Sequence, residues 1–344
     1  MNNQRILPNI FITIGAVFAL PQLLVAATFL TFDPPGSTLT SPTAITATGA
    51  IIGSYKDASG VTHGFLRKPN GNFNIFDVPG SAVTSPTDIT PGGVITGWYC
   101  DTADCLNQGN PKGFVRAADG TFTTFSAPVG DFLLNLGFSR SGPPPSINPV
   151  GAIVGTYSGP ICCHQHGFLR TPDGTFKTID YPGAQYTDVV AINPAGVIVG
   201  DFCNDVTCSQ GFLRTPDGTF TVINADAGFP TAINLAGAIT GFARTETGGY
   251  VWSRDGTFTT FNPTGSIYTA PFAINCAGAI TGYYCDDFGN LACHGFVRAS
   301  DGNITTFDPP GSIFTYAVGI NRAGVITGAF SDASGVSHGF VRFP

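Results

Sequence analysis

Residues 191–223, AINPAGVIVGDFCNDVTCSQGFLRTPDGTFTVI, contain four short apolar runs separated by turn signals. The first run ends at Asn193, and the next three are VIVGDF, GFLR and TFTVI. The segments between them, N-P-A-G, N-D-V-T and P-D-G, are typical of turns. Apolar runs of this length between such turns predict β-strands in a meander.

The same pattern returns, with changes, from Thr28 to the last residue, Pro344. Aligned on the run F-x-x-F, seven repeats start at Phe29, Phe73, Phe122, Phe176, Phe220, Phe258 and Ile304. Each repeat also carries G-[AV]-I-[ITV]-G, which ends at Gly53, Gly97, Gly155, Gly200, Gly241, Gly282 and Gly328. Repeats of about 40 to 45 residues with four strands are typical of propeller blades. The sequence therefore predicts an all-β fold, a seven-bladed β-propeller of four-stranded antiparallel blades that forms a single domain over residues 28–344.

The order of strands within a blade is predicted from proline, which lacks the N–H group that a central strand needs. Five prolines stand three residues before the isoleucine of the first strand, at Pro42, Pro86, Pro144, Pro230 and Pro271. This strand should therefore be the free edge at a central channel, with F-x-x-F outermost. Because the chain begins with an outermost strand and ends with a third strand, we expect residues 29–33 to pair with residues 339–343 and close the ring.

Composition excludes several classes of protein. Charged residues are only 11% of the chain and phenylalanine alone supplies 29 residues, which suits a large packed core and not a disordered chain. The net charge is −7 and there is no basic run, so nucleic acid is not an expected partner. Recurring aromatic positions, such as Tyr55 and Phe65 and their equivalents, are predicted to fill the space between blades.

The first 27 residues resemble a secretory signal in their organisation. Arg5 precedes an apolar stretch, and Val25 and Ala27 stand where signal peptidase selects small residues. An uncleaved membrane anchor is the alternative, although Pro8 and Pro21 interrupt the apolar stretch. We therefore expect a protein that is secreted, periplasmic or held at the cell surface, with no membrane contact after cleavage.

In an exported chain, the nine cysteines are expected first as disulfides. Three pairs each bracket the turn between second and third strands, where facing positions lie within disulfide reach. These pairs are Cys100 with Cys105, Cys203 with Cys208, and Cys285 with Cys293. Cys162, Cys163 and Cys276 remain, so at least one thiol is free or pairs between chains.

The sequence offers three candidate metal sites, and each has a structural alternative. Four histidines occupy one position of the repeat, directly before GF[LV]R: His63, His166, His294 and His338. Equivalent positions on neighbouring blades are too far apart to share a metal ion, so a structural role is favoured for these residues. Cys162, Cys163, His164 and His166 could hold a soft metal, or could form an ordinary surface loop. The aspartates in turns between second and third strands are common turn formers, and calcium binding there is a less specific alternative: Asp57, Asp101, Asp205, Asp286 and Asp332.

The repeats resemble those of the HAF family of bacterial extracellular proteins, whose units have the form A-x-x-I-N-x-x-G-x-V-V-G followed by H-A-F-L-W. The matching stretches here are AINPAGVIVG at 191–200, AINCAGAITG at 273–282, and HGFLR or HGFVR at four places. Glycine replaces the usual alanine and arginine the usual tryptophan, apart from Trp252. The resemblance implies an exported β-repeat protein and carries no assigned activity.

No motif in the sequence identifies a reaction or a cofactor. Glutamate occurs once, at Glu246, and the patterns of serine hydrolases, zinc proteases and phosphate-binding loops are absent. Turns of variable length share one face of the predicted propeller, and loops of this kind commonly bind ligands. Candidate residues of this face are Phe132, Leu133, Leu134, Phe138, Asp101, Asp205 and Asp286. The sequence therefore favours a binding or structural module for an extracellular glycan or protein, with an extracellular propeller hydrolase or lyase that acts at the channel mouth as the alternative.

Overall fold

The computed structural model describes residues 27–103, 111–126, 145–158, 165–204, 209–224, 226–244, 248–287 and 292–344. The regular structure of these residues is entirely β-strand. In this part of the chain no helix is long and apolar enough to cross a membrane. The predicted signal segment, residues 1–27, lies almost wholly outside the described residues.

Most strands fall into consecutive antiparallel units of four, as the meander pattern predicts. Three units lie in the first half of the chain: β2 (Ser37–Ile45), β3 (Ile51–Asp57), β4 (Thr62–Arg67) and β5 (Phe73–Phe76); β6 (Val83–Ile89), β7 (Ile95–Cys100), β8 (Lys112–Arg116) and β9 (Phe122–Phe125); β10 (Ser146–Ile147), β11 (Ile153–Ser158), β12 (Gln165–Arg170) and β13 (Phe176–Ile179). Three more follow: β14 (Tyr186–Ile192), β15 (Ile198–Cys203), β16 (Gln210–Arg214) and β17 (Phe220–Val222); β18 (Ala227–Ile233), β19 (Ile239–Ala243), β20 (Gly249–Trp252) and β21 (Phe258–Phe261); β22 (Tyr268–Ile274), β23 (Ile280–Asp287), β24 (Ala292–Arg298) and β25 (Ile304–Phe307).

The last unit is built from both ends of the chain. It contains β26 (Ser312–Ile320), β27 (Ile326–Asp332) and β28 (Ser337–Arg342), and its fourth strand is β1 (Phe29–Phe32). β1 runs antiparallel to β28, with Phe29 opposite Arg342 and Phe32 opposite Gly339. This is the strand pairing that the offset ends of the repeat pattern predict.

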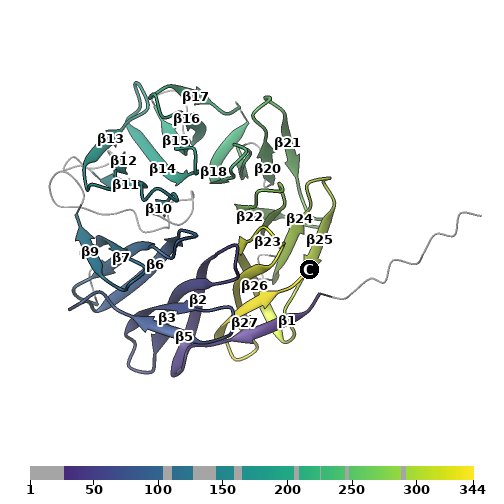
Figure 1. The fold of residues 1–344 in the computed structure, drawn as a ribbon. Coiled ribbons are helices and arrows are strands. Elements are labelled where there is room, and N and C mark those ends of the chain that lie inside the picture. Colours follow the sequence, from purple (N-terminus) through teal and green to yellow (C-terminus); the bar gives the residue numbers. More distant parts are fainter. Residues whose placement is uncertain are drawn as a thin grey trace, which may run out of the picture.

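The units are arranged around a central opening (Figure 1). The first strand of each unit, such as β2, β6 or β14, lies beside the opening, and the fourth strand, such as β5, β9 or β17, lies at the outer edge. The first strand is also where the ladder is irregular, because a β-bulge follows Pro42, Pro86, Pro230 and Pro271. Proline therefore marks the inner strand, as expected for a residue that cannot donate to a ladder.

Two glycines of the repeat make room for aromatic rings. A Cβ on Gly53 would lie 2.8 Å from Cζ of Phe65, and it would also collide with the bulged backbone of Ser41 and Pro42. A Cβ on Gly64 would lie 2.7 Å from the ring of Phe76. The motifs G-x-I-x-G and G-F therefore recur because only glycine lets the strands and rings approach this closely.

The core lies between neighbouring units. In one cluster Phe32 and Val341, from the unit built from both chain ends, pack with Ile51, Tyr55 and Phe65 of the next unit. The arginine of GF[LV]R adds a contact across the same boundary, because its guanidinium stacks on an outer phenylalanine of the preceding unit. The Cζ-to-centroid distances are 5.0 Å for Arg67 on Phe32, 4.8 Å for Arg116 on Phe76 and 4.9 Å for Arg342 on Phe307.

Buried asparagines link the inner strands from unit to unit. Asn193 Oδ1 accepts hydrogen bonds from the backbone N–H groups of Ala195 and Val197, which holds its own turn. Its Nδ2 donates to the carbonyl of Asn234, at 3.2 Å. In the same way, the Nδ2 atoms of Asn234, Asn275 and Asn321 donate to the backbone carbonyls of Asn275, Asn321 and Thr46, respectively. The last of these bonds joins the C-terminal unit to the first.

Replacing Phe32 by alanine should lower the free energy of unfolding by about 3 to 5 kcal/mol, because the ring is buried against Phe65 and Arg67 of the next unit. Leu30→Ala in the same strand is the matched control. Since Leu30 is 42% exposed, its change should stay within about 0.5 kcal/mol. Urea denaturation measures both. Equal stability of the two variants would mean that β1 does not close the outer edge of this unit.

Candidate functional site

The repeated histidines lie beside aspartates at the end of the units that carries the variable turns. Each donor atom is Nδ1, and each acceptor is the aspartate that follows the fourth strand: Asp77 for His63 at 2.8 Å, Asp180 for His166 at 2.8 Å, Asp308 for His294 at 2.7 Å and Asp33 for His338 at 2.7 Å. Three of the rings also approach the turn aspartate with Nε2, which lies 3.4 Å from Asp57 in the case of His63. The histidines therefore tie the ends of the second, third and fourth strands together.

The turn aspartates act as turn formers. Asp57 accepts hydrogen bonds from the hydroxyl of Ser59 and from the backbone N–H groups of Ser59 and Val61. These bonds, with Ser59 the largest contributor, lower the pKa of Asp57 to about 2. Asp332 makes the same turn with Ser334 and Val336, and its pKa is likewise lowered to about 2.

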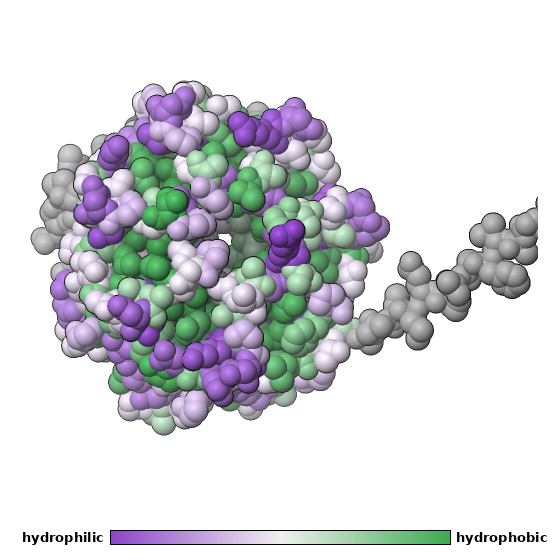
Figure 2. Space-filling model, in the orientation of Figure 1, coloured by the Kyte–Doolittle hydropathy of each residue, from purple (hydrophilic) through white to green (hydrophobic). Residues whose placement is uncertain are grey.

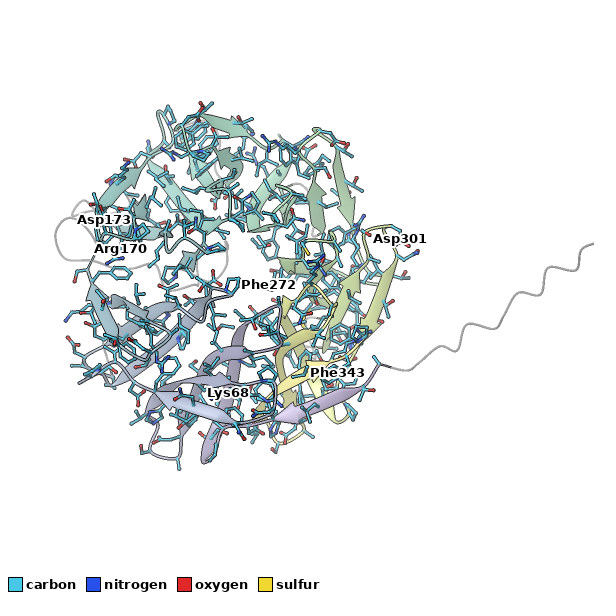
Figure 3. The ribbon with its side chains drawn as sticks, in the orientation of Figure 1. Lys68, Arg170, Asp173, Phe272, Asp301 and Phe343 are labelled. Atoms are coloured by element: carbon cyan, nitrogen blue, oxygen red, sulfur yellow. A yellow bond between two sulfur atoms is a disulfide. The ribbon has the colours of Figure 1, made fainter. Side chains whose placement is uncertain are left out.

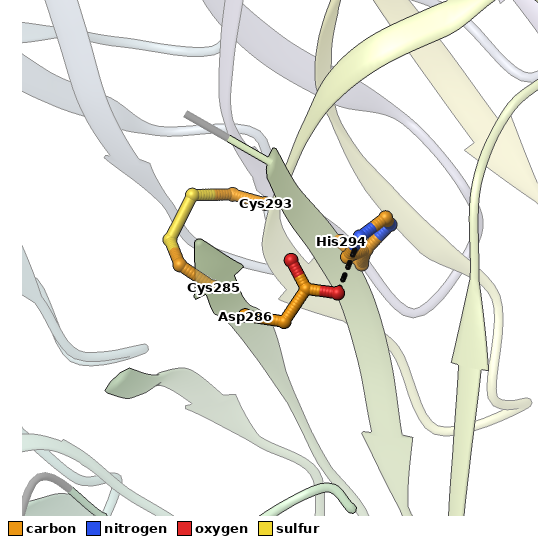
Figure 4. The surroundings of a disulfide bond; sticks show 4 residues. All are labelled: Cys285, Asp286, Cys293 and His294. Carbon is orange, nitrogen blue, oxygen red and sulfur yellow. Dashed lines mark ion pairs between the residues drawn. A yellow bond between two sulfur atoms is a disulfide. The ribbon is translucent and has the colours of Figure 1, made fainter. Parts of the chain in front are cut away.

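Among the predicted disulfides, Cys285 and Cys293 are bonded and stand opposite each other in the β23–β24 ladder. Figure 4 shows the disulfide on one side of this hairpin and the pair Asp286–His294 on the other, as alternation along a strand requires. The two side chains of that pair are 3.6 Å apart. Cys100 and Cys203 are also disulfide-bonded, and their predicted partners, Cys105 and Cys208, lie outside the described residues.

The remaining candidates divide between exposed groups and residues that are not described. Asp101 forms a surface ion pair with Lys112, and Cys276 is a free, exposed thiol. The candidates that lie outside the described residues are Phe132, Leu133, Leu134, Phe138, Asp205, Cys162, Cys163 and His164. Within the described ranges, no group of three or more histidine, cysteine, aspartate or glutamate side chains is placed to hold a metal ion.

Six half-buried aromatic residues gather where β19, β22, β23 and β26 meet. We call them the aromatic cluster: Phe242, Tyr268, Phe272, Tyr283, Phe314 and Tyr316. Ring centroids are 5.8 Å apart for Phe272 and Tyr283, 4.9 Å for Phe272 and Tyr316, and 5.0 Å for Tyr283 and Tyr316. Phe272 lies beside the central opening (Figure 3), which the space-filling view shows as a hollow (Figure 2). The cluster therefore presents aromatic surface at the channel.

The hydroxyl groups of Tyr283 and Tyr316 are uncharged. Burial raises the pKa of Tyr283 well above its usual range, and the neighbouring Tyr268 and Tyr316 raise it further. Burial also raises the pKa of Tyr316. These two hydroxyl groups therefore remain able to donate a hydrogen bond at any physiological pH.

A second group of polar residues is buried between the β14–β17 and β18–β21 units. Asp188 stands opposite Asp201 in the ladder, and both side chains are almost fully buried. Burial, and then the charge of Asp188, raise the pKa of Asp201 well above its usual value. Tyr250, from the neighbouring unit, is fully buried and its pKa is raised by burial and by Asp201.

Sequence reasoning missed two features of these sites. It did not single out the aspartate after each fourth strand, although His63 and Asp77, His166 and Asp180, and His294 and Asp308 share a separation of 14 residues. It assigned every aromatic column to the core and did not find the aromatic cluster. The sequence signal for the cluster is Phe272. The residue after the inner-strand proline is threonine in three other units, at Thr43, Thr87 and Thr231, but it is phenylalanine here.

The fold and its central opening define a β-propeller-like, all-β protein. Virginiamycin B lyase from Staphylococcus aureus, a catalytically inactive variant with quinupristin, matches with a TM-score of 0.59 and 14% identity over 92% of this chain and 100% of that chain. A streptogramin B lyase matches with a TM-score of 0.57 and 15% identity, over 92% of this chain and 97% of that chain. Oligogalacturonate lyase in complex with manganese matches with a TM-score of 0.57 and 9% identity, over 93% of this chain and 96% of that chain. At these identities the likeness shows the fold alone. The sequence matches neither a protein-family model nor a curated protein.

The pairing of His338 should make stability depend on pH. Hydrogen bonding to Asp33 raises the pKa of His338 above its ordinary value of 6.5. A raised pKa in the folded state means that the protonated ring stabilises the fold fully below pH 6.5, and that this contribution is lost as pH rises through the folded pKa. Asp332, with a pKa lowered to about 2, loses its contribution only in strong acid and does not interfere.

We therefore expect His338→Gln to have a lower free energy of unfolding than the wild type at about pH 5.5. The difference in the free energy of unfolding should be smaller at about pH 8.5. Chemical denaturation at both pH values measures this. A gap that is the same at both would show that His338 acts only by packing.

Proposed function

We propose that this protein is a secreted, seven-bladed β-propeller, closed by its two terminal strands, that binds an extracellular carbohydrate at the aromatic cluster. Closure is supported by the β1–β28 pairing and by the hydrogen bond from Asn321 to Thr46. Export is supported by the signal-like residues 1–27 and by the Cys285–Cys293 disulfide, because disulfides persist in oxidising compartments. The repeats resemble those of HAF proteins, which are extracellular.

The observation that carries the proposal is the position of Phe272. It is the extra residue of the bulge after Pro271, and a bulge of this kind redirects a side chain out of the ladder. At the equivalent bulges Thr43 donates to the carbonyl of Pro86, and Thr87 to the carbonyl of Pro145, each in the next unit. Phe272 has no hydroxyl group to make this hydrogen bond, and it places a ring beside the channel instead. A role in binding accounts for the replacement of threonine by phenylalanine at this position.

The chemistry of the cluster fits a sugar. All six of its members are uncharged, and they combine aromatic faces with three tyrosine hydroxyl groups. A pyranose ring presents C–H groups on its face, which suit the negative face of an aromatic ring, and hydroxyl groups at its rim, which suit tyrosine. Apolar walls with a few converging polar groups are typical of ligand sites.

An extracellular hydrolase or lyase with a site at the channel mouth is the rival function. Several structures with a similar fold are lyases, but that likeness does not extend to a site. Catalysis at the mouth would require carboxylates or a metal among the residues that gather there. The described residues of the aromatic cluster carry no such group, and the Asp188–Asp201 pair is buried between units.

The test is titration calorimetry of the mature protein against neutral and acidic oligosaccharides selected on a glycan array. Phe272→Thr, which restores the threonine of three other units and should fold normally, is expected to weaken binding by about 1 to 3 kcal/mol, the scale of a ring stacked on an aromatic side chain. Phe343→Thr is the matched control, because Phe343 is 41% exposed and does not belong to the cluster. Its affinity should equal that of the wild type.

Two results would contradict the proposal. The first is an absence of oligosaccharide binding by the wild type, and the second is equal binding by Phe272→Thr. Mass spectrometry of the incubated oligosaccharides tests the rival, because cleavage products would indicate an enzyme.

A further inference from the structure

The strongest unexplained feature outside the aromatic cluster is a set of buried oxygen atoms between the β14–β17 and β18–β21 units. Asp201 is fully buried and neither of its carboxylate oxygens has a hydrogen-bond partner. The hydroxyl of Tyr250, also fully buried, has none either. Unpaired buried polar groups of this kind are rare in folded proteins, and a bound ion or an ordered water is one explanation for them.

The preceding boundary between units shows why Asp201 has no donor. There, Thr156 occupies the position of Asp201, one residue after the glycine of G-x-I-x-G. Its hydroxyl oxygen accepts a hydrogen bond of 2.9 Å from the N–H group of Val189 in the next unit. At the Asp201 boundary the residue equivalent to Val189 is Pro230, which has no N–H group.

Tyr250 is a second departure from the repeat at the same boundary. It stands opposite Gly241, as Phe212 stands opposite Gly200 and Phe296 opposite Gly282. The tyrosine therefore adds a single hydroxyl group to a ring that is otherwise core. That hydroxyl lies close enough to Asp201 for the carboxylate charge to raise the pKa of Tyr250.

The neighbouring carboxylate completes a set of oxygen ligands. Asp188 is directly opposite Asp201 in the ladder, is 2% exposed, and accepts a hydrogen bond of 2.5 Å from the hydroxyl of Tyr186. The carbonyl of Gly228 also points into this boundary, since a Cβ on Gly211, opposite Asp201, would come within 2.9 Å of its oxygen. Side chains directly opposite in a ladder share one face of the sheet.

We propose that Asp188, Asp201 and Tyr250 hold a calcium ion between these two units. Two carboxylates balance the charge of a divalent ion, which removes the cost of two like charges facing each other away from water. Carboxylate, carbonyl and hydroxyl oxygens are hard ligands, and calcium accepts more of them, with looser geometry, than magnesium does. Bound there, the ion would join two units of the ring. This inference is independent of carbohydrate binding.

The experiment uses the full mature chain. Metal analysis of protein purified without chelator should find about one calcium ion per chain, and removal with EGTA should lower the melting temperature by several degrees, which calcium chloride restores. Asp201→Asn, which keeps the shape and removes the charge, should weaken calcium binding at least about tenfold, a loss expected even for a residue that only supports a metal ligand. Tyr250→Phe, which restores the ring of the other units, should weaken it less.

The control variant is Asp217→Asn, an exposed turn carboxylate of the same unit, which should bind calcium like the wild type. An equal response to magnesium chloride would overturn the assignment to calcium. If no calcium copurifies, calcium chloride leaves the melting temperature unchanged, and Asp201→Asn is more stable than the wild type, then the two carboxyl groups share a proton and the proposal is wrong.

Discussion

The structure depends on one steric constraint, which is the absence of a side chain at the glycine that ends G-x-I-x-G. At this point the inner strand bulges toward its neighbour and the phenylalanine of the third strand lies over the second. A Cβ on Gly97 would lie 2.7 Å from the ring of Phe114, and one on Gly282 would lie 2.8 Å from the Cα of Pro271. Glycine permits both approaches at once. The buried ring, which contributes roughly 2 to 3 kcal/mol, and the bulged inner strand therefore arise from the same residue.

The constraint also decides which positions are free to change. The residue after each glycine faces the next unit and is Ser54, Trp98, Thr156, Asp201, Phe242, Tyr283 or Ala329. Thr156 uses this position to bind the backbone of the next inner strand. Asp201 and Tyr283 occupy the same position with different chemistry, one among the buried oxygens and the other in the aromatic cluster. Both candidate sites therefore arise where a fixed backbone presents a variable side chain to its neighbour.

The sequence alone predicted the features that follow from repetition. Strand order, the core rings at Phe65 and its equivalents, the pairing of the terminal strands and the Cys285–Cys293 disulfide all depend on spacing within or between repeats. The sites were not predictable in this way, because they depend on contacts between units. Tyr250 interacts with Asp201 of the preceding unit, and the cluster combines Phe242 with residues from two later units. Such contacts become visible only when the arrangement of the units around the opening is known.

The asparagines that stabilise the turns after the inner strands also connect each unit to the next. Asn275 holds its own turn through Oδ1 and donates through Nδ2 to the carbonyl of Asn321, so one side chain serves two units. Because each of these amides is buried, loss of one leaves a carbonyl of the next unit without its donor, and such groups are costly. The bond from Asn321 to Thr46 crosses from the last unit to the first. The inner edge is thus joined across the chain ends by a hydrogen bond, while β1 and β28 pair at the outer edge.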